Sequence, residues 1–167
     1  MEGIPISNKN PSYAELLRSP TLLLAFGFGS GLAPKAPGTF GTLAAIPLWL
    51  LLCQLSVSLY WSVIAVSVIV GIYVCGRASS KLGVHDHSGI VWDEFVGLWI
   101  TFAFIEPQLT SVIVGFLLFR LFDILKPWPI SWLDKQVGAG IGIMIDDIVA
   151  GFFAAIVIVV ISNLGFL

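Results

Sequence analysis

Charged residues are scarce in this chain. Asp, Glu, Lys and Arg make up 11 % of its 167 residues, whereas soluble domains contain roughly 25 %. Hydrophobic residues make up 57 %, and a water-surrounded core of this length cannot bury so much apolar surface. The composition therefore excludes an ordinary soluble domain. It predicts an integral membrane protein, organised as a single domain over residues 1–167.

Cysteine and basic charge are also in short supply. Cys53 and Cys75 lie inside apolar runs, which argues against a disulfide framework and against a Cys-based metal site. A net charge of −2 gives no reason to expect nucleic acid as a partner. The N-terminal segment 1–20 is polar and contains three prolines, so a cleaved secretory signal is not expected.

Long apolar runs are what the chain has in abundance. No Asp, Glu, Lys or Arg occurs from Gly38 to Gly76, enough for two crossings of about 20 residues each. We expect an all-α polytopic bundle with four to five transmembrane helices. The candidate spans are residues 39–53, 59–76, 90–105, 109–125 and 143–160, of which 90–105 is the weakest.

The segment 21–28 is too short to span a bilayer, so we expect a re-entrant or interfacial helix there. Ser19 is its expected N-cap, with Pro20 at the first helical position. The small pairs Ala150-Gly151 and Ala154-Ala155 indicate close helix packing in the last span.

Basic residues support this topology. In the five-span arrangement all of them fall on one side, which the positive-inside rule makes cytoplasmic. They are Lys9, Arg18, Lys35, Arg77, Lys81, Arg120, Lys126 and Lys135. Four tryptophans are candidate anchors at that interface, although Trp99 also suits packing between helices; they are Trp92, Trp99, Trp128 and Trp132.

Most acidic residues are expected at the same side, several of them embedded in apolar sequence. They are Asp86, Asp93, Glu94, Asp123, Asp134, Asp146 and Asp147. Ionisable groups at membrane depth are costly and usually functional. Clustered carboxylates need a cation among them, and oxygen ligands favour Mg²⁺, with Mn²⁺ as the alternative.

Two acidic segments have competing interpretations. Arg120, Asp123 and Lys126 share one helix face and suit an anion site, or else an intrahelical ion pair with a snorkelling lysine. Asp146 and Asp147 fall in the first turn of the predicted helix 143–160 and suit a metal site, or else a favourable interaction with the helix dipole.

Two loops add candidates. In the Gly-rich loop before residue 39, Thr39 would cap the first span with Lys35 nearby, as a phosphate cradle or as a simple turn and cap. In His85-Asp86-His87, a histidine suits a phosphate contact or a proton donor, and a solvated loop residue equally well.

Seven short blocks follow one another between residues 23 and 154. They are Gly27-Phe28-Gly29-Ser30-Gly31, Pro37-Gly38-Thr39, Val84-His85-Asp86-His87, Ile90-Val91-Trp92-Asp93-Glu94, Phe119-Arg120-Leu121-Phe122-Asp123, Lys126-Pro127-Trp128-Pro129-Ile130 and Gly142-Ile143-Met144-Ile145-Asp146-Asp147-Ile148-Val149-Ala150-Gly151. In this order they resemble the bacterial phosphatidylglycerophosphatase A family.

The resemblance implies a multi-pass enzyme of the bacterial inner membrane, with its site on the cytoplasmic side. It implies hydrolysis of the terminal phosphate of phosphatidylglycerophosphate, giving phosphatidylglycerol for phospholipid biosynthesis, and a requirement for Mg²⁺. The substrate would be a phospholipid in the bilayer. The roles of individual residues and the oligomeric state stay open.

Other phosphatase chemistries lack their signatures here. Neither cysteine begins a Cys-x₅-Arg motif, and no Asp-x-Asp-x-Thr or Ser-Gly-His motif occurs. Activated water or an Asp nucleophile remains, and water is favoured. The expected catalytic residues are Asp93, Glu94, Asp146, Asp147 and His85, the last as proton donor. The expected substrate-binding residues are Lys35, Thr39, Arg120 and Lys126. The expected metal ligands are Asp86, Glu94, Asp123, Asp146 and Asp147.

A small cation-coupled transporter or channel is the alternative function. It expects ionisable groups spread across the depth of the membrane, whereas the sequence places them on one side.

Overall fold

The computed structural model describes residues 10–84, 87–132 and 138–167, and within these ranges it is helical and contains no strand. The expected all-α fold is confirmed for this part of the chain. The elements in order are α1 (Tyr13–Leu17), α2 (Pro20–Ala25), the 3₁₀ helix η1 (Gly27–Leu32), α3 (Pro37–Leu52), α4 (Val57–Leu82), α5 (Trp92–Phe102), α6 (Leu109–Leu125) and α8 (Ala139–Asn163).

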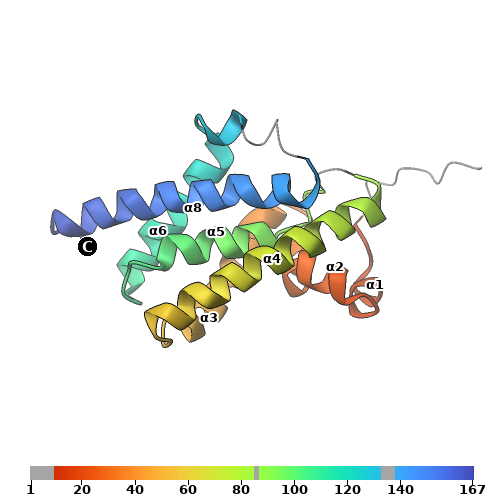
Figure 1. Ribbon diagram of the computed structural model, residues 1–167, viewed down its shortest axis with the longest axis horizontal. Helices are drawn as coiled ribbons and strands as arrows, with labels where there is room; N and C mark the ends of the chain where they lie inside the picture. Colours follow the sequence, from red (N-terminus) through yellow and green to blue (C-terminus); the bar gives the residue numbers. More distant parts are fainter. Residues whose placement is uncertain (1–9, 85–86, 133–137) are drawn as a thin grey trace, which may run out of the picture.

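The longer helices form a bundle in which α4, α5 and α8 lie along its length (Figure 1). The start of α8 packs on the end of α4, where Gly140 lies against the Ile72 carbonyl. The end of α6 meets the start of α5 through Arg120 and Glu94, and Gly38 at the start of α3 touches the same Glu94 side chain. One end of the bundle therefore collects the starts of α3, α5 and α8 and the ends of α4 and α6.

Helix α5 is the centre of the bundle. It packs against α3, α4, α6 and α8, and each of its residues except Asp93 is buried. Trp92 donates its indole N–H to the Ser67 carbonyl at 3.1 Å, and Trp99 donates to the Ala45 carbonyl at 3.0 Å. These two tryptophans therefore connect helices, and the suggestion that Trp92 anchors the membrane interface is wrong.

Two helices, α4 and α8, are long and apolar enough to cross a membrane, among the residues that the structure describes. The expectation of four to five spans is not confirmed. Helix α3 is apolar but has 16 residues, about 24 Å at 1.5 Å per residue. Helix α5 has 11 residues, about half of the roughly 30 Å hydrocarbon thickness, and it is apolar because other helices surround it.

Helices α5 and α8 pack with almost no side chain between them. A Cβ added to Gly97 would meet the Asp147 carbonyl at 2.7 Å, and one added to Gly151 would meet the Gly97 carbonyl. Ala150 and Ala154 are fully buried on α8. The predicted close packing of these small residues is confirmed, and it holds the α8 backbone directly against α5.

The N-terminal helices form a small layer against α4. Pro20 is the first residue of α2, as expected, whereas the side chain of Ser19 makes no capping hydrogen bond. Leu22 and Ala25 are buried, and α2 packs against α4. In Figure 1, α1 and α2 lie beside the last turns of α4.

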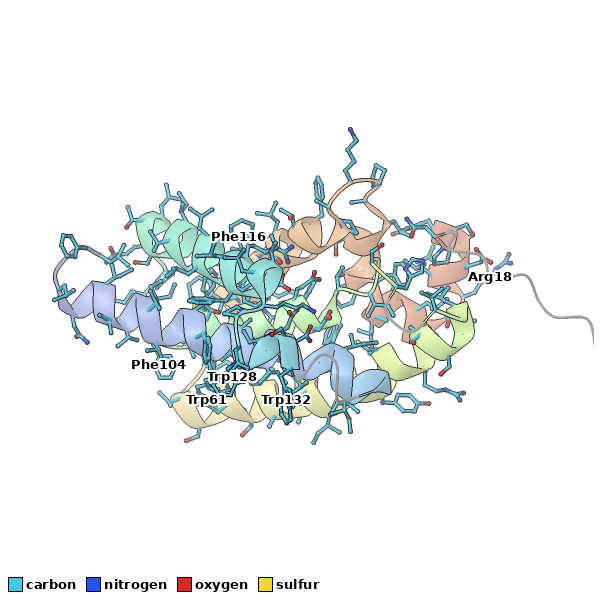
Figure 2. The ribbon with its side chains drawn as sticks, turned by 90° about the horizontal axis from the view of Figure 1, so that it is seen from above. Arg18, Trp61, Phe104, Phe116, Trp128 and Trp132 are labelled. Carbon is cyan, nitrogen blue, oxygen red and sulfur yellow. The ribbon has the colours of Figure 1, made fainter. Side chains whose placement is uncertain are left out.

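Aromatic side chains also occur on the outer surface of the bundle. Trp61 and Phe104, whose ring centroids are 6.0 Å apart, lie toward one end of the molecule in Figure 2, and Arg18 lies at the other. Trp128 and Trp132 are exposed, 79 % and 54 %, and follow the end of α6. Both side chains are exposed, as a role in anchoring the protein at the membrane interface requires.

Candidate active site

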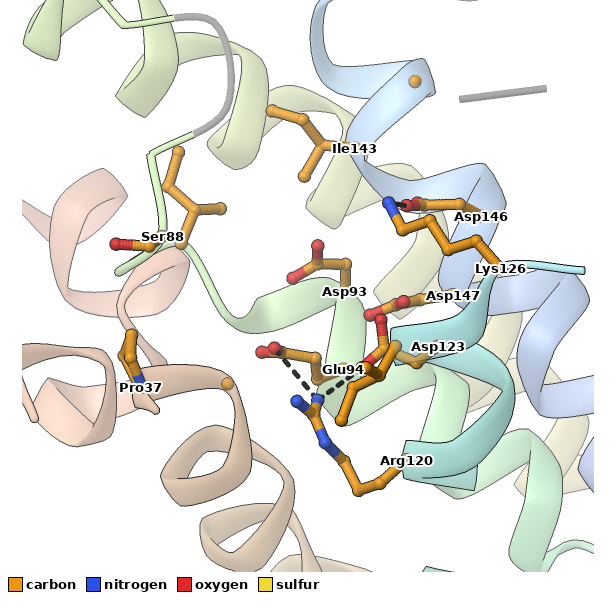
Figure 3. A pocket seen from close by; sticks show the side chains of 14 residues that line it. Pro37, Ser88, Asp93, Glu94, Arg120, Asp123, Lys126, Ile143, Asp146 and Asp147 are labelled. Carbon is orange, nitrogen blue, oxygen red and sulfur yellow. Dashed lines mark hydrogen bonds and ion pairs between the residues drawn. The ribbon is translucent and has the colours of Figure 1, made fainter. Parts of the chain in front are cut away.

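A polar cavity of about 280 Å³ opens at the end of the bundle where α3, α5 and α8 begin and α6 ends. Its size is near the lower limit of typical small-molecule pockets, roughly 300–1,000 Å³. Seven charged side chains line it: Asp93, Glu94, Arg120, Asp123, Lys126, Asp146 and Asp147. Figure 3 shows that they come from α5, α6 and α8 and the residue after α6.

Arg120 lies between two of the carboxylates. Its Nη1 is 2.5 Å from Oδ2 of Asp123 and 3.4 Å from Oε1 of Glu94, and it also donates to the Thr42 hydroxyl at 3.4 Å. The Arg120 side chain is 14 % exposed. The predicted i, i+3 ion pair with Asp123 therefore exists, but it belongs to a network that extends to Glu94 on α5 (Figure 3) and to Thr42 on α3.

Lys126 closes the opposite side of the cavity. It is the C-cap of α6, with a left-handed φ of 41°, a conformation that costs a non-glycine residue of order 1 kcal/mol or more. That turn carries its ammonium group to Asp146, 2.5 Å away on α8. Lys126 thus points into the site, and the interpretation of it as a snorkelling lysine is wrong.

Asp146 and Asp147 lie deeper in α8 than expected. The helix begins at Ala139 and has no acid in its first turn, so the prediction that these residues lie in the first turn is wrong. Gly140 and Gly142 do not stop the helix because its start is packed on α4, where Gly140 touches the Ile72 carbonyl. The helix dipole acts mainly within the first turn, so it does not account for these two acids.

The backbone of α3 supports Glu94. A Cβ at Gly38 would collide with Oε1 of Glu94, and a Cβ at Gly41 would lie 3.0 Å from its Oε2. The fully buried Thr42 donates its hydroxyl to the Gly38 carbonyl at 2.8 Å while accepting from Arg120. Glycine is needed at both positions because the carboxylate lies against the helix.

The charges suit a divalent cation. Five acids face two bases, a formal excess of three negative charges when all are ionised, and Asp147 interacts electrostatically with the other four acids. All five offer carboxylate oxygens, the ligands that Mg²⁺ prefers. In the described part of the chain, no three acidic, histidine or cysteine side chains are gathered as closely as one ion requires. The donor chemistry therefore fits Mg²⁺, while the ligand set is not defined.

The cavity brings together most of the residues predicted from the sequence. The predicted residues that line it are Asp93, Glu94, Arg120, Asp123, Lys126, Asp146 and Asp147. Lys35 is exposed and Thr39 half-buried, and neither lines the cavity. Thr39 is also not the N-cap of α3, because that helix begins at Pro37 after Ala36. His85 and Asp86 lie outside the described residues.

Sequence reasoning missed three residues on α3. Gly38, Gly41 and Thr42 touch Glu94 or Arg120. The available signal was the spacing Gly38-x-x-Gly41-Thr42 in the first turns of a membrane helix, since small residues there permit a close approach of another element. That spacing predicts a contact without naming its partner.

Comparisons with known proteins agree on one family. The family model described as Phosphatidylglycerophosphatase A matches residues 23–162. The chain is 51 % identical over 140 residues to phosphatidylglycerophosphatase A of Escherichia coli K12, covering 83 % of this chain and 81 % of that protein. It is 46 % identical over 156 residues to phosphatidylglycerophosphatase A of Haemophilus influenzae Rd, covering 92 % and 95 %.

A further relative carries a different name. A Bacteroides thetaiotaomicron protein, provisionally named a phosphatidylinositol-3-phosphatase, is 37 % identical over 160 residues, covering 91 % of this chain and 96 % of its own length. No solved structure matches the chain. The names of all three relatives describe phosphatases that act on a phosphorylated lipid headgroup.

Proposed function

The chain belongs to the phosphatidylglycerophosphatase A family and is a phosphatase, and we propose that it hydrolyses phosphatidylglycerophosphate to phosphatidylglycerol and phosphate with Mg²⁺. The observation that carries the proposal is that five carboxylates and two cations line one cavity. Such a cavity suits a phosphate monoester together with a divalent cation.

The proposed placement is multi-pass, in the bacterial inner membrane, with the cavity on the cytoplasmic side. Helices α4 and α8 meet the length requirement, and α3 and α6 would cross beside them as shorter spans that the bilayer accommodates by local thinning. Lys35, Arg77, Lys81, Arg120 and Lys126 all lie at the cavity end of their helices or loops, which the positive-inside rule makes cytoplasmic.

In this placement the acyl chains stay in the bilayer while the phosphorylated headgroup enters the cavity. Arg120 and Lys126 lie on two sides of it and would pair with the phosphate oxygens as negative charge develops. Both are held by carboxylates, so their positions are set before substrate arrives. This preorganisation lowers the reorganisation required in the transition state.

The hydrolytic step needs a base, a nucleophile and a proton donor. Water attacks phosphorus, the bond from phosphorus to the glycerol oxygen breaks, and a carboxylate takes the proton of the water. Asp93 and Asp147 are the preferred bases, because both carboxylates line the cavity beside Arg120 and Lys126. His85, outside the described residues, is the candidate that protonates the leaving oxygen.

The acidic residues would hold Mg²⁺, with Glu94, Asp123, Asp146 and Asp147 as the first candidates. When bound, the cation supplies charge neutralisation of the phosphate and a lower pKa for a coordinated water. The same carboxylates would keep Arg120 and Lys126 in position, so substitution of an acid affects both binding and geometry.

The transporter alternative is not favoured. An ion path needs ionisable groups through the depth of the bundle, whereas the charged residues of the cavity gather at one end. The middle of α5 is occupied by large buried side chains such as Phe95, Trp99 and Phe102. Packing of this kind blocks a polar route along the bundle.

The test is phosphate release from phosphatidylglycerophosphate by purified protein in detergent, with Mg²⁺ and with a chelator. Asp146→Asn and Asp147→Asn are compared with Glu106→Gln, which removes an exposed carboxylate at the other end of the bundle. We expect Mg²⁺-dependent release, lost in the two Asp variants and kept in the control. Absence of release with any divalent metal would refute the proposal.

A further inference from the structure

A second cavity, of about 480 Å³, lies between the start of α2 and the last turns of α4. Its lining residues are two cations and three hydroxyl side chains: Ser19, Thr21, Arg77, Ser80 and Lys81. In the part of the chain that the structure describes, no acid lines it, and it shares no lining residue with the catalytic cavity. Both cavities lie toward the end of the bundle where α4 ends and α8 begins.

The two cations of this cavity share one face of α4. Arg77 and Lys81 are four residues apart, with Ser80 between them on the same side. Cys75 and Ala78 on the inner side of the helix are fully buried, whereas Arg77 and Lys81 are exposed. The cationic face is therefore turned away from the bundle.

Glu15, an acid that interacts with Lys81, has its own hydrogen-bond partner. The Ser12 backbone N–H and hydroxyl both donate to its carboxylate at 2.7 Å, and these hydrogen bonds lower the pKa of Glu15, with smaller contributions from Lys81 and Arg18. Among the described residues, this region therefore contains one ionised carboxylate and three cations, Arg18, Arg77 and Lys81. The local balance favours an anion.

An exposed apolar stripe leads along α4 to this cavity. Val66, Ile69 and Tyr73 are 58 %, 69 % and 61 % exposed. They precede Arg77 at steps of three or four residues, so they lie on the same helix face. A molecule with its phosphate at Arg77 and Lys81 would therefore have its apolar chain along this stripe.

We propose that the cavity formed by Ser19, Thr21, Arg77, Ser80 and Lys81 binds the phosphate of an anionic phospholipid, with an acyl chain along Val66, Ile69 and Tyr73. The inference rests on the membrane placement given under the proposed function. Lipid phosphate and free phosphate ester share the headgroup chemistry, and the apolar stripe favours the lipid. The lipid would occupy the cytoplasmic leaflet beside the catalytic cavity.

The experiment measures thermal unfolding of the purified full chain in a neutral detergent, titrated with dioleoylphosphatidylserine. This lipid is a phosphodiester and offers no terminal phosphate to the catalytic cavity. Dioleoylphosphatidylcholine and glycerophosphoserine, a phosphodiester without acyl chains, are the comparison ligands, and a ligand bound only by the folded state raises the unfolding midpoint. Phosphate release by the wild type, measured separately, reports on the proposed function alone.

Two charge variants and one neutral variant locate the site. Arg77→Gln and Lys81→Gln are each expected to weaken apparent affinity for phosphatidylserine about fivefold, because each removes one cation near an anionic headgroup. Thr21→Val removes a lining hydroxyl without changing charge and is expected to weaken affinity as well. Arg18→Gln is the matched control, since Arg18 lies nearby but does not line the cavity.

The expected result is a midpoint shift with phosphatidylserine, none with phosphatidylcholine, and a loss of affinity in the cavity variants that exceeds the loss in Arg18→Gln. An equal loss in Arg18→Gln would reveal diffuse attraction and overturn the site. An equal shift with phosphatidylcholine would overturn the preference for anionic lipid, and an equal shift with glycerophosphoserine would overturn the lipid assignment. Because lipid binding is read from unfolding, an inactive wild type would refute the proposed function without deciding this one.

Discussion

Replacing Arg120 by Gln tests the preorganised cation in the catalytic cavity. The guanidinium contacts Asp123 at 2.5 Å and Glu94 and Thr42 at 3.4 Å, and its side chain is 14 % exposed. The substitution leaves five acids facing one cation, Lys126, so the formal excess of negative charge rises from three to four. Both the approach of a phosphate and the charge that develops during hydrolysis become less favourable.

The size of the effect follows from the two roles of the side chain. Loss of one preorganised group that stabilises transition-state charge costs about 10²–10³ in kcat, or about 2.7–4 kcal/mol. Hydrogen bonds to charged groups contribute about 1.5–3 kcal/mol to stability, so the unfolding free energy should fall by about that amount or less, because the ion pairs are partly exposed. Catalysis should therefore suffer more than folding.

The assay is phosphate release in mixed micelles at varied surface concentration of substrate, which separates kcat from KM. Arg120→Lys keeps the charge without the planar fork of donors, and an intermediate kcat is expected. Size-exclusion profiles and unfolding midpoints establish which variants are folded, and Glu106→Gln is the charge control. A folded Arg120→Gln enzyme whose kcat stays within about threefold of the wild type would contradict the role assigned to Arg120.

Three further predictions concern other parts of the molecule. Gly38→Ala should lower kcat because the added Cβ collides with Glu94. Reduced phosphate release together with an unchanged unfolding midpoint would locate the effect in the site. Gly151→Val should lower stability by about 1–3 kcal/mol, the usual cost of overpacking, because even a Cβ there meets the Gly97 carbonyl; an unchanged unfolding midpoint would contradict this packing. Asp147→Asn should weaken Mg²⁺ binding at least about tenfold, as expected when a metal carboxylate or its support is lost, and an unchanged Mg²⁺ titration of the unfolding midpoint would remove Asp147 from the metal site.

Local pattern was enough to find the long helices. The segment 109–125 was predicted with both of its bounds, as α6 shows, because Glu106-Pro107-Gln108 before it and Pro127 after it stop a helix on either side. The predicted segment 143–160 was too short by four residues at its start, since Gly140 and Gly142 looked like loop residues. Their place in a helix depends on the contact with α4, and no local pattern records that contact.

Most of the candidate site could be predicted because placing a charged side chain in an apolar segment costs free energy. Asp93, Glu94, Arg120, Asp123 and Asp147 stood out because an ionisable group in a lipid-soluble helix needs a partner or a function, and all five line one cavity. Lys35 and Thr39 are predicted from a Gly-rich loop and an expected helix N-cap, and they do not line it. The composition of a segment predicts a loop, but it does not predict whether the side chains of that loop face the cavity.

The sequence by itself determined the helical class, the concentration of charge at one side and, through its family motifs, the phosphatase identity. These three properties depend on the order of residues along the chain and on the free-energy cost of placing charge in apolar surroundings. Only the tertiary structure decided that residues 90–105, an apolar run like the others, contain the central buried helix α5, and that Gly38 and Gly41 lie against Glu94. Hydropathy measures only how apolar a segment is. A segment that contacts lipid and a segment that is covered by neighbouring helices are both apolar, so only the packing of the helices distinguishes a membrane span from a buried helix.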